Sequence, residues 1–102
     1  LTAIIDYNKI QSFGRTSDVI NLEPLAKKWS SFGWNVFEIN GHDFSELDDA
    51  FLSKTDTRPK LIIAHTIKGK GISFMEDKLE WHYKCPNEEE LKLAIEEIDN
   101  TQ

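Results

Sequence analysis

The chain has 102 residues, 39% hydrophobic and 29% charged, which is the composition of an ordinary globular chain of one domain at most. Twelve basic and eighteen acidic side chains give a net charge of −6, which argues against nucleic-acid or membrane partners because both would require a basic face. No apolar run approaches the roughly 20 residues that cross a bilayer. The single Cys85 excludes an internal disulfide and fits a reducing cytosol, so we expect a cytoplasmic protein.

The apolar opening of the chain, with two isoleucines and no methionine, is typical of a buried strand already under way. A processed terminus or an edge strand would also give this pattern. We expect a fragment whose upstream part is missing, with the first strand over residues 2–6 and a polar, irregular loop over residues 7–21.

A helix is expected to begin near Pro24 and to end at Gly33, a suitable place for a left-handed cap. Three- and four-residue spacing gives it one apolar face, made of Leu22, Leu25, Trp29 and Phe32. Residues 34–39 alternate in part and predict a second strand, which ends at the turn Gly41-His42-Asp43.

Asp43 or Ser45 can cap the next helix, whose expected apolar side consists of Phe44, Leu47, Phe51 and Leu52. Residues 60–65 are apolar nearly throughout and predict a third strand covered on both faces. Residues 66–84 form a long excursion with little periodicity. A last helix opens with Asn87 as N-cap and Glu90 three residues on, and its expected buried face is Leu91, Ile95 and Ile98.

This alternation of strands and helices predicts the α/β class, with a parallel sheet, right-handed crossovers and helices on both faces. Ligands of such sheets bind beyond the carboxyl ends of the strands. The segments that follow the three strands are residues 6–10, 40–43 and 66–71.

Two of these segments contain candidate binding residues, each with a plainer alternative. Lys68 and Lys70 alternate with glycines whose N–H groups could approach a phosphate, but the segment could equally be a surface turn with solvated lysines. Asn8 offers a neutral oxygen of the kind that Mg²⁺ takes, or it could be a turn residue that satisfies its own backbone.

The histidines are not at metal-motif spacing, so a zinc site is not expected. His65 ends a buried strand and fits plain packing. His82 lies between Trp81 and Tyr83 in a loop, as a site histidine might. The acidic pairs are most simply solvated helix faces, and Cys85 has no evident activating partner.

Beyond these signals, the sequence closely resembles the thiamine-diphosphate-binding domain of transketolase, in particular the N-terminal section of two-subunit transketolases. The matching stretches are residues 3–11 (AIIDYNKIQ), 14–16 (GRT), 21–26 (NLEPLA), 32–34 (FGW), 41–43 (GHD), 66–71 (TIKGKG), 73–76 (SFME) and 80–82 (EWH). They occur in the family's order and cover nearly the whole chain. The resemblance implies that residues 1–102 are a partial diphosphate-binding domain, the C-terminal part of that fold.

The resemblance also implies site residues. The Asn8 side chain and the Ile10 carbonyl would bind a cation, Mg²⁺ or Ca²⁺, that holds the diphosphate of thiamine diphosphate. Ile67 falls where the family has an apolar contact to the cofactor, and Ser12 at a position expected to touch the thiazolium. His82 falls where the family has a histidine near the diphosphate and the reacting substrate, and is the expected catalytic residue.

Some family features are missing or altered. The Gly-Asp-Gly half of the cofactor motif and the upstream substrate histidines would precede Leu1. The activating glutamate would come from a pyrimidine-binding domain or a C-terminal subunit, in a homodimer or heterotetramer. Ser12-Phe13 stands where the family usually has Ile-Asp, and Tyr83 replaces a glycine.

We therefore expect part of a transketolase N-terminal subunit, inactive alone, that serves ketol transfer between sugar phosphates in the pentose phosphate pathway. A deoxyxylulose-phosphate synthase or a 2-oxoacid dehydrogenase component is the alternative among thiamine enzymes. The third hypothesis is a non-catalytic α/β module.

Overall fold

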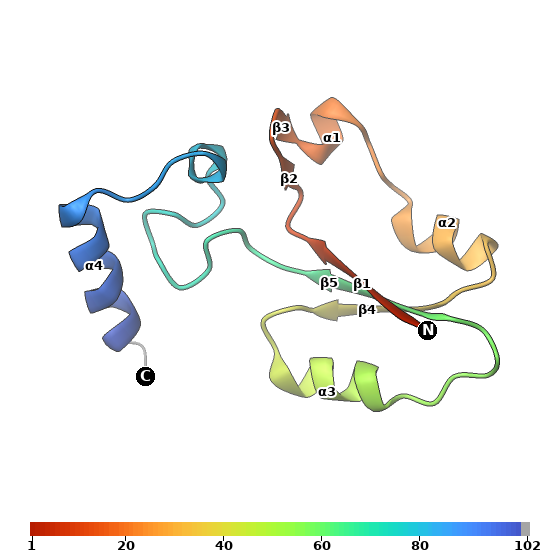
Figure 1. Cartoon of the computed structure of the whole chain (residues 1–102). Coiled ribbons are helices and arrows are strands. Elements are labelled where there is room, and N and C mark those ends of the chain that lie inside the picture. Colours follow the sequence, from red (N-terminus) through yellow and green to blue (C-terminus); the bar gives the residue numbers. More distant parts are fainter. Residues whose placement is uncertain (101–102) are drawn as a thin grey trace. The chain divides into compact units, whose positions relative to one another are not determined.

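The computed structural model describes residues 1–100, which form two compact units (Figure 1). The first unit comprises Leu1–Asn8 and Ile20–Thr66, and the second comprises Lys9–Val19 and the chain from Ile67 onward. Within residues 1–100, no helix is long and apolar enough to cross a membrane.

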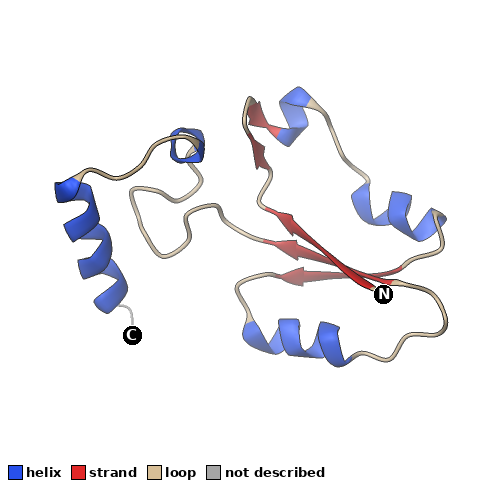
Figure 2. Ribbon diagram, in the orientation of Figure 1, coloured by secondary structure: helices blue, strands red, loops and turns tan. Residues whose placement is uncertain are grey.

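The first unit is built on a three-stranded parallel sheet in the order β1-β5-β4 (Figure 2). The strands are β1 (Thr2–Tyr7), β4 (Asn35–Asn40) and β5 (Lys60–His65). In the register of the sheet, His65 pairs with both Tyr7 and Asn40, so all three strands end together at their carboxyl ends. The predicted parallel sheet is confirmed, with each boundary within one residue of the expectation.

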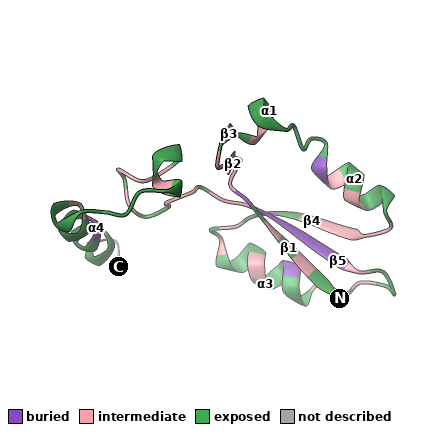
Figure 3. Ribbon diagram, turned by 45° about the horizontal axis from the view of Figure 1, so that its top comes forward, coloured by how far each residue is buried: buried purple, intermediate pink, exposed green. Residues whose placement is uncertain are grey.

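Helices cover both faces of this sheet, as the sequence predicts. The middle of β5 is completely buried at Leu61, Ile62 and Ile63 (Figure 3). Helix α2 (Leu25–Ser31) contributes Leu25 to the cluster on one face. Helix α3 (Phe44–Leu52) contributes Ala50 to the cluster on the other.

The predicted apolar faces of these two helices are partly wrong. Leu22 and Phe32 lie outside α2, which is only seven residues long, and Phe32 is 79% exposed. Trp29 packs against the core cluster that contains Leu25, as predicted, and lies edge-on to Trp34 with ring centroids 5.0 Å apart. In α3, Leu47 and Ala50 face the sheet, whereas the larger apolar residues Phe44, Phe51 and Leu52 are exposed.

The last helix, α4 (Glu88–Asp99), begins with the expected capping box. The Asn87 side chain accepts hydrogen bonds from the N–H groups of Glu89 and Glu90, and the Glu90 carboxylate accepts one from the N–H of Asn87. The expected burial of this helix is wrong in residues 1–100. Ala94 is buried, whereas Leu91, Ile95 and Ile98 are 45–50% exposed because no described element covers them.

Four short elements lie in segments expected to be irregular. Strands β2 (Ile10–Gln11) and β3 (Gly14–Arg15) form an antiparallel hairpin, followed by α1 (Thr16–Val19). The 3₁₀ helix η1 (Leu79–His82) interrupts the long excursion. Elements of two to four residues are too short to show a hydrophobic period, which explains why the sequence pattern misses them.

Lys60 at the start of β5 is a buried lysine with a structural role. Its side chain is only 6% exposed, and Nζ donates hydrogen bonds to the carbonyl oxygens of Ala50, Phe51 and Ser53 at 2.7–2.8 Å. The last carbonyls of a helix have no partner within the helix, and a positive charge is favourable at that end. Lys60 therefore ties the end of α3 to the central strand.

We predict that Lys60→Met lowers the free energy of unfolding of the complete protein by about 2 kcal/mol, since methionine keeps the apolar stem but removes three charge-assisted hydrogen bonds. Urea denaturation measures the change. Lys54→Met, at an exposed position of the following loop, is the control and should change stability little. Equal effects of the two substitutions would contradict the structural role of Lys60.

Candidate functional site

The carboxyl edge of the sheet carries polar groups in close contact. Thr66, directly after β5, donates a hydrogen bond from its hydroxyl to the Asp6 carboxylate of β1. The Gly41 N–H donates to the carbonyl of His65 at 2.9 Å. A Cβ on Gly41 would lie 2.5 Å from Cγ2 of Thr66, so only glycine fits where the chain leaves β4. This edge is the place where open α/β sheets bind ligands.

Asn8 lies at this edge, immediately after β1, as the sequence predicts. Its side chain is half-buried. The next residue, Lys9, has a left-handed φ of 65°, so the chain turns sharply on leaving the strand. The Lys9 carbonyl then accepts a hydrogen bond from the N–H of Thr16 at 3.0 Å, which closes the start of the hairpin segment.

His65 has a packing environment, as expected. Its Nε2 atom lies 3.0 Å from the Glu38 carboxylate, and its ring centroid lies 5.5 Å from that of Tyr7. Tyr7 is itself buried and donates its hydroxyl proton to Glu23 at 2.7 Å. These contacts connect two strands with the segment that leads into α2.

In the second unit, two predicted site residues are in direct contact. The Ser12 hydroxyl, in the turn of the β2–β3 hairpin, lies 2.9 Å from Nε2 of His82, the last residue of η1. The Tyr83 hydroxyl donates to the carbonyl of Ser12 at 3.0 Å. Ser12 therefore links the hairpin turn to the end of η1 through both its side chain and its backbone.

Trp81 of η1 connects this helix to the preceding loop. Its indole N–H donates to the carbonyl of Phe74 at 3.0 Å, and the two rings are tilted with centroids 5.5 Å apart. The ammonium group of Lys84 lies 4.3 Å from the centre of the Trp81 ring and pairs with Glu90 at 2.5 Å. The hydrogen bond from Lys84 is the main cause of the lowered pKa of Glu90.

The segment 66–71 resembles a surface turn more than an anion cradle. Lys70 pairs with Glu76 at 3.4 Å, and the Gly71 N–H already donates to the Glu76 carboxylate at 3.1 Å. A Cβ on Gly69 would lie 2.7 Å from the carbonyl oxygen of Met75, so this glycine is required by close backbone packing. Lys68 forms no ion pair within residues 1–100, so its positive charge is not balanced by a carboxylate of the described residues.

Ile67 and Ile10 belong to the same unit as Ser12 and His82. Ile67 is 41% exposed, so an apolar surface is available there. Ile10 begins β2 and is half-buried. Asn8 belongs to the first unit. Among the described residues, no three His, Cys, Asp or Glu side chains gather as metal ligands.

Sequence reasoning did not find the ion pair between Arg15 and Asp77. The guanidinium of Arg15 donates two hydrogen bonds of 2.6 Å to the two carboxylate oxygens of Asp77. The two residues are 62 positions apart in the chain, so no local pattern signals the pair. It joins strand β3 to the loop before η1, and the hydrogen bonds from Arg15 lower the pKa of Asp77.

We predict that this ion pair stabilises the protein above pH 3.8, the ordinary pKa of Asp77, and that its contribution disappears as the pH falls through the lowered folded value. Asp77→Asn should therefore lower Tm at pH 7 but have little effect near pH 2. The control is Asp48→Asn, at an exposed position of α3. A Tm difference for Asp77→Asn that is independent of pH would contradict the assignment.

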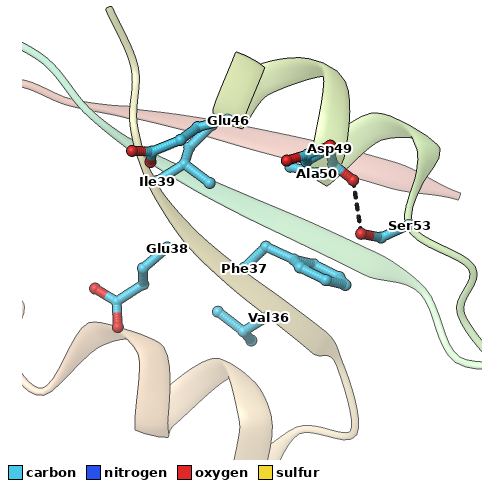
Figure 4. Close-up of a pocket in the computed structure, with 8 residues that line it drawn as sticks. All are labelled: Val36, Phe37, Glu38, Ile39, Glu46, Asp49, Ala50 and Ser53. Atoms are coloured by element: carbon cyan, nitrogen blue, oxygen red, sulfur yellow. Dashed lines mark hydrogen bonds between the residues drawn. The ribbon is translucent and has the colours of Figure 1, made fainter. Parts of the chain in front are cut away.

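A separate concavity of about 380 Å³ lies between β4 and α3 (Figure 4). Val36, Phe37 and Ile39 of β4 line it, with Glu46 and Ser53 opposite. Two of its polar side chains bond to the backbone: Glu46 accepts a hydrogen bond from the N–H of Asn40 at 2.7 Å, and the Ser53 hydroxyl donates to the carbonyl of Asp49 at 2.6 Å. We assign it to the packing of α3.

Comparison with known proteins identifies the family of this chain. Residues 1–99 match the domain described as "Transketolase, thiamine diphosphate binding domain". The chain is 41% identical over 100 residues to one of the subunits of the apulose-4-phosphate transketolase of Phocaeicola vulgatus, covering 96% of this chain and 36% of that protein. It is 43% identical over 101 residues to the 6-deoxy-6-sulfo-D-fructose transketolase subunit SqwG of Clostridium sp., covering 97% and 37%.

A solved structure gives the same result. The crystal structure of transketolase from Campylobacter jejuni matches with a TM-score of 0.87 at 33% identity, over 97% of this chain and 16% of that one. The parallel sheet with a helix on each face places this chain in the α/β class, whose ligand sites lie at the carboxyl edge of the sheet. The chain belongs to the transketolase family, in its thiamine-diphosphate-binding domain. It spans 36% of the length of the first relative named.

Proposed function

We propose that this chain is part of a transketolase N-terminal subunit that binds thiamine diphosphate and a divalent cation for transfer of a two-carbon ketol unit between sugar phosphates. The observation that carries the proposal is the family match over residues 1–99, together with the position of Asn8 directly after the first strand. In this proposal residues 1–102 are a partial diphosphate-binding domain. The cytoplasmic location stays a prediction from composition.

Asn8 and Ile10 are the proposed cation ligands, through the side-chain oxygen and the backbone carbonyl. Neutral oxygens of these two kinds are donors that Mg²⁺ and Ca²⁺ accept. Because the described residues hold no cluster of three acidic or histidine ligands, the remaining coordination would come from a diphosphate and from groups outside these residues. One amide oxygen and one carbonyl oxygen are a partial donor set that could hold such a cation, with its remaining ligands supplied by other groups.

Ile67 and His82 are the proposed contacts to the cofactor and substrate, and Ser12 is proposed as a member of the same cofactor site. The exposed Ile67 offers an apolar surface, and His82 can hydrogen-bond a phosphate or a developing oxyanion. Thiamine diphosphate supplies the carbanion chemistry when bound, and the protein orients it. The Ser12 hydroxyl lies within hydrogen-bonding distance of the His82 ring.

A second polypeptide is part of the proposal because two relatives are named as subunits of transketolases. We propose a C-terminal subunit or pyrimidine-binding domain as the partner, in a homodimer or heterotetramer. The names of those relatives specify a phosphorylated sugar in one case and a sulfonated ketose in the other. A sugar that carries a terminal anionic group is therefore the proposed substrate class.

We predict that Asn8→Ala in the complete protein weakens metal-dependent binding of thiamine diphosphate by about 1–3 kcal/mol, because a charged group loses a hydrogen-bonding or coordinating oxygen. Calorimetric titration with and without Mg²⁺ measures the loss. Asn35→Ala, at the opposite end of the sheet, is the control. Unchanged affinity in Asn8→Ala would defeat the assignment of Asn8 and favour a non-catalytic module.

We predict that His82→Ala lowers turnover at least tenfold while the unfolding midpoint changes little, because the side chain is exposed and contributes to no apolar cluster. Steady-state kinetics and thermal unfolding of the complete enzyme measure the two quantities. His42→Ala provides a matched histidine substitution outside the second unit. Loss of folding in His82→Ala would mean that His82 is a structural residue.

A further inference from the structure

The hydrogen bond between Ser12 and His82 points to a role for Ser12 that acts through the histidine. The two residues are 70 positions apart, and the bond of 2.9 Å involves Nε2 of the imidazole. The other ring nitrogen, Nδ1, has no hydrogen-bond partner within residues 1–100. The pair thus has one nitrogen engaged by the protein and one available to a ligand.

The surroundings of the pair restrict both partners. Ser12 is fixed in the hairpin turn because its carbonyl accepts the hydrogen bond from Tyr83. The Tyr83 ring also meets the His82 ring nearly edge-on, with centroids 4.9 Å apart and planes at 79°. The backbone of Ser12, its hydroxyl and the ring of Tyr83 therefore limit the rotation of an imidazole that is otherwise exposed.

We propose that Ser12 is a positioning residue for His82: its hydroxyl holds Nε2 and leaves Nδ1 as the nitrogen that meets an oxyanion oxygen developing on the reacting substrate. This inference rests on the proposed function of His82. It differs from the expectation that Ser12 itself touches the thiazolium, because the hydroxyl acts on the histidine. A serine hydroxyl can donate or accept, so it can serve either neutral tautomer of the ring.

The bond can be removed without disturbing the backbone contact. Ser12→Ala deletes the hydroxyl but keeps the carbonyl that Tyr83 binds. Ser12→Thr retains a hydroxyl and should behave as the parent protein does. Ser17→Ala, in the same unit, is the matched serine control, since its hydroxyl bonds only the neighbouring Asp18.

The first test is chemical and needs no turnover. In the complete protein, bound to its partner but free of cofactor, diethyl pyrocarbonate modifies accessible neutral imidazoles, and mass spectrometry of peptides gives the rate at each histidine. We expect Ser12→Ala to raise the rate at His82 about three- to tenfold relative to His42, because Nε2 then becomes accessible beside Nδ1 and the ring is less restricted; a change of this size corresponds to the loss of one hydrogen bond. Unchanged reactivity at His82 would overturn the proposal.

The second test is a double-mutant cycle in the loaded enzyme. Ser12→Ala should lower kcat about three- to tenfold, with KM and cofactor affinity unchanged, and should have no further effect in a His82→Ala background. Weakened cofactor binding, or an effect that is additive with His82→Ala, would overturn the inference in favour of direct contact with the cofactor.

The positioning role of Ser12 and the proposed role of His82 can be contradicted separately. If His82→Ala lowers turnover but Ser12→Ala does not, the positioning role of Ser12 is wrong and the proposed function stands. If His82→Ala keeps full turnover, the proposed role of His82 is wrong, and the positioning role of Ser12 is then wrong as well.

Discussion

Complete burial of one strand organises the first unit. Leu61, Ile62 and Ile63 of β5 are closed to solvent on both faces, so a helix must cover each side of the sheet. Because β1 and β4 both pair with β5 in the same direction, all three strands end at one edge. Lys60 adds a polar constraint, since its ammonium group ties α3 to the start of the same strand. The position of Asn8 follows from this arrangement.

The second unit depends on another kind of interaction. Ala94 is its one buried residue within the described part of the chain, so it has almost no apolar core. Polar contacts between distant residues take that place, among them those of Arg15 with Asp77 and of Ser73 with Glu97. The hydrogen bonds from Ser73 lower the pKa of Glu97, so this contact, like that of Asp77, is present at neutral pH and lost in acid.

The sequence predicted the first unit better than the second, for a physical reason. Buried strands and capped helices leave long apolar or alternating patterns, which located β1, β4, β5 and the start of α4. The exposed faces of α3 and α4 were missed because periodicity identifies an apolar stripe but not whether anything covers it. In the candidate site, Asn8 could be placed from the end of its strand. The contact between Ser12 and His82 could not be predicted, because the two residues are 70 positions apart and only folding brings them together.

Ser12 and Tyr83, two of the three positions at which the sequence departs from the expected family pattern, are in contact with each other. Tyr83 donates its hydroxyl proton to the carbonyl of Ser12, and Ser12 in turn engages His82. A glycine in place of Tyr83 could not make the first contact, and an isoleucine in place of Ser12 could not make the second. Ser12 and Tyr83 therefore together restrict the His82 ring, which does not belong to an apolar core. Because this unit has almost no apolar core, the hydrogen bond from Tyr83 restricts the serine that in turn contacts His82.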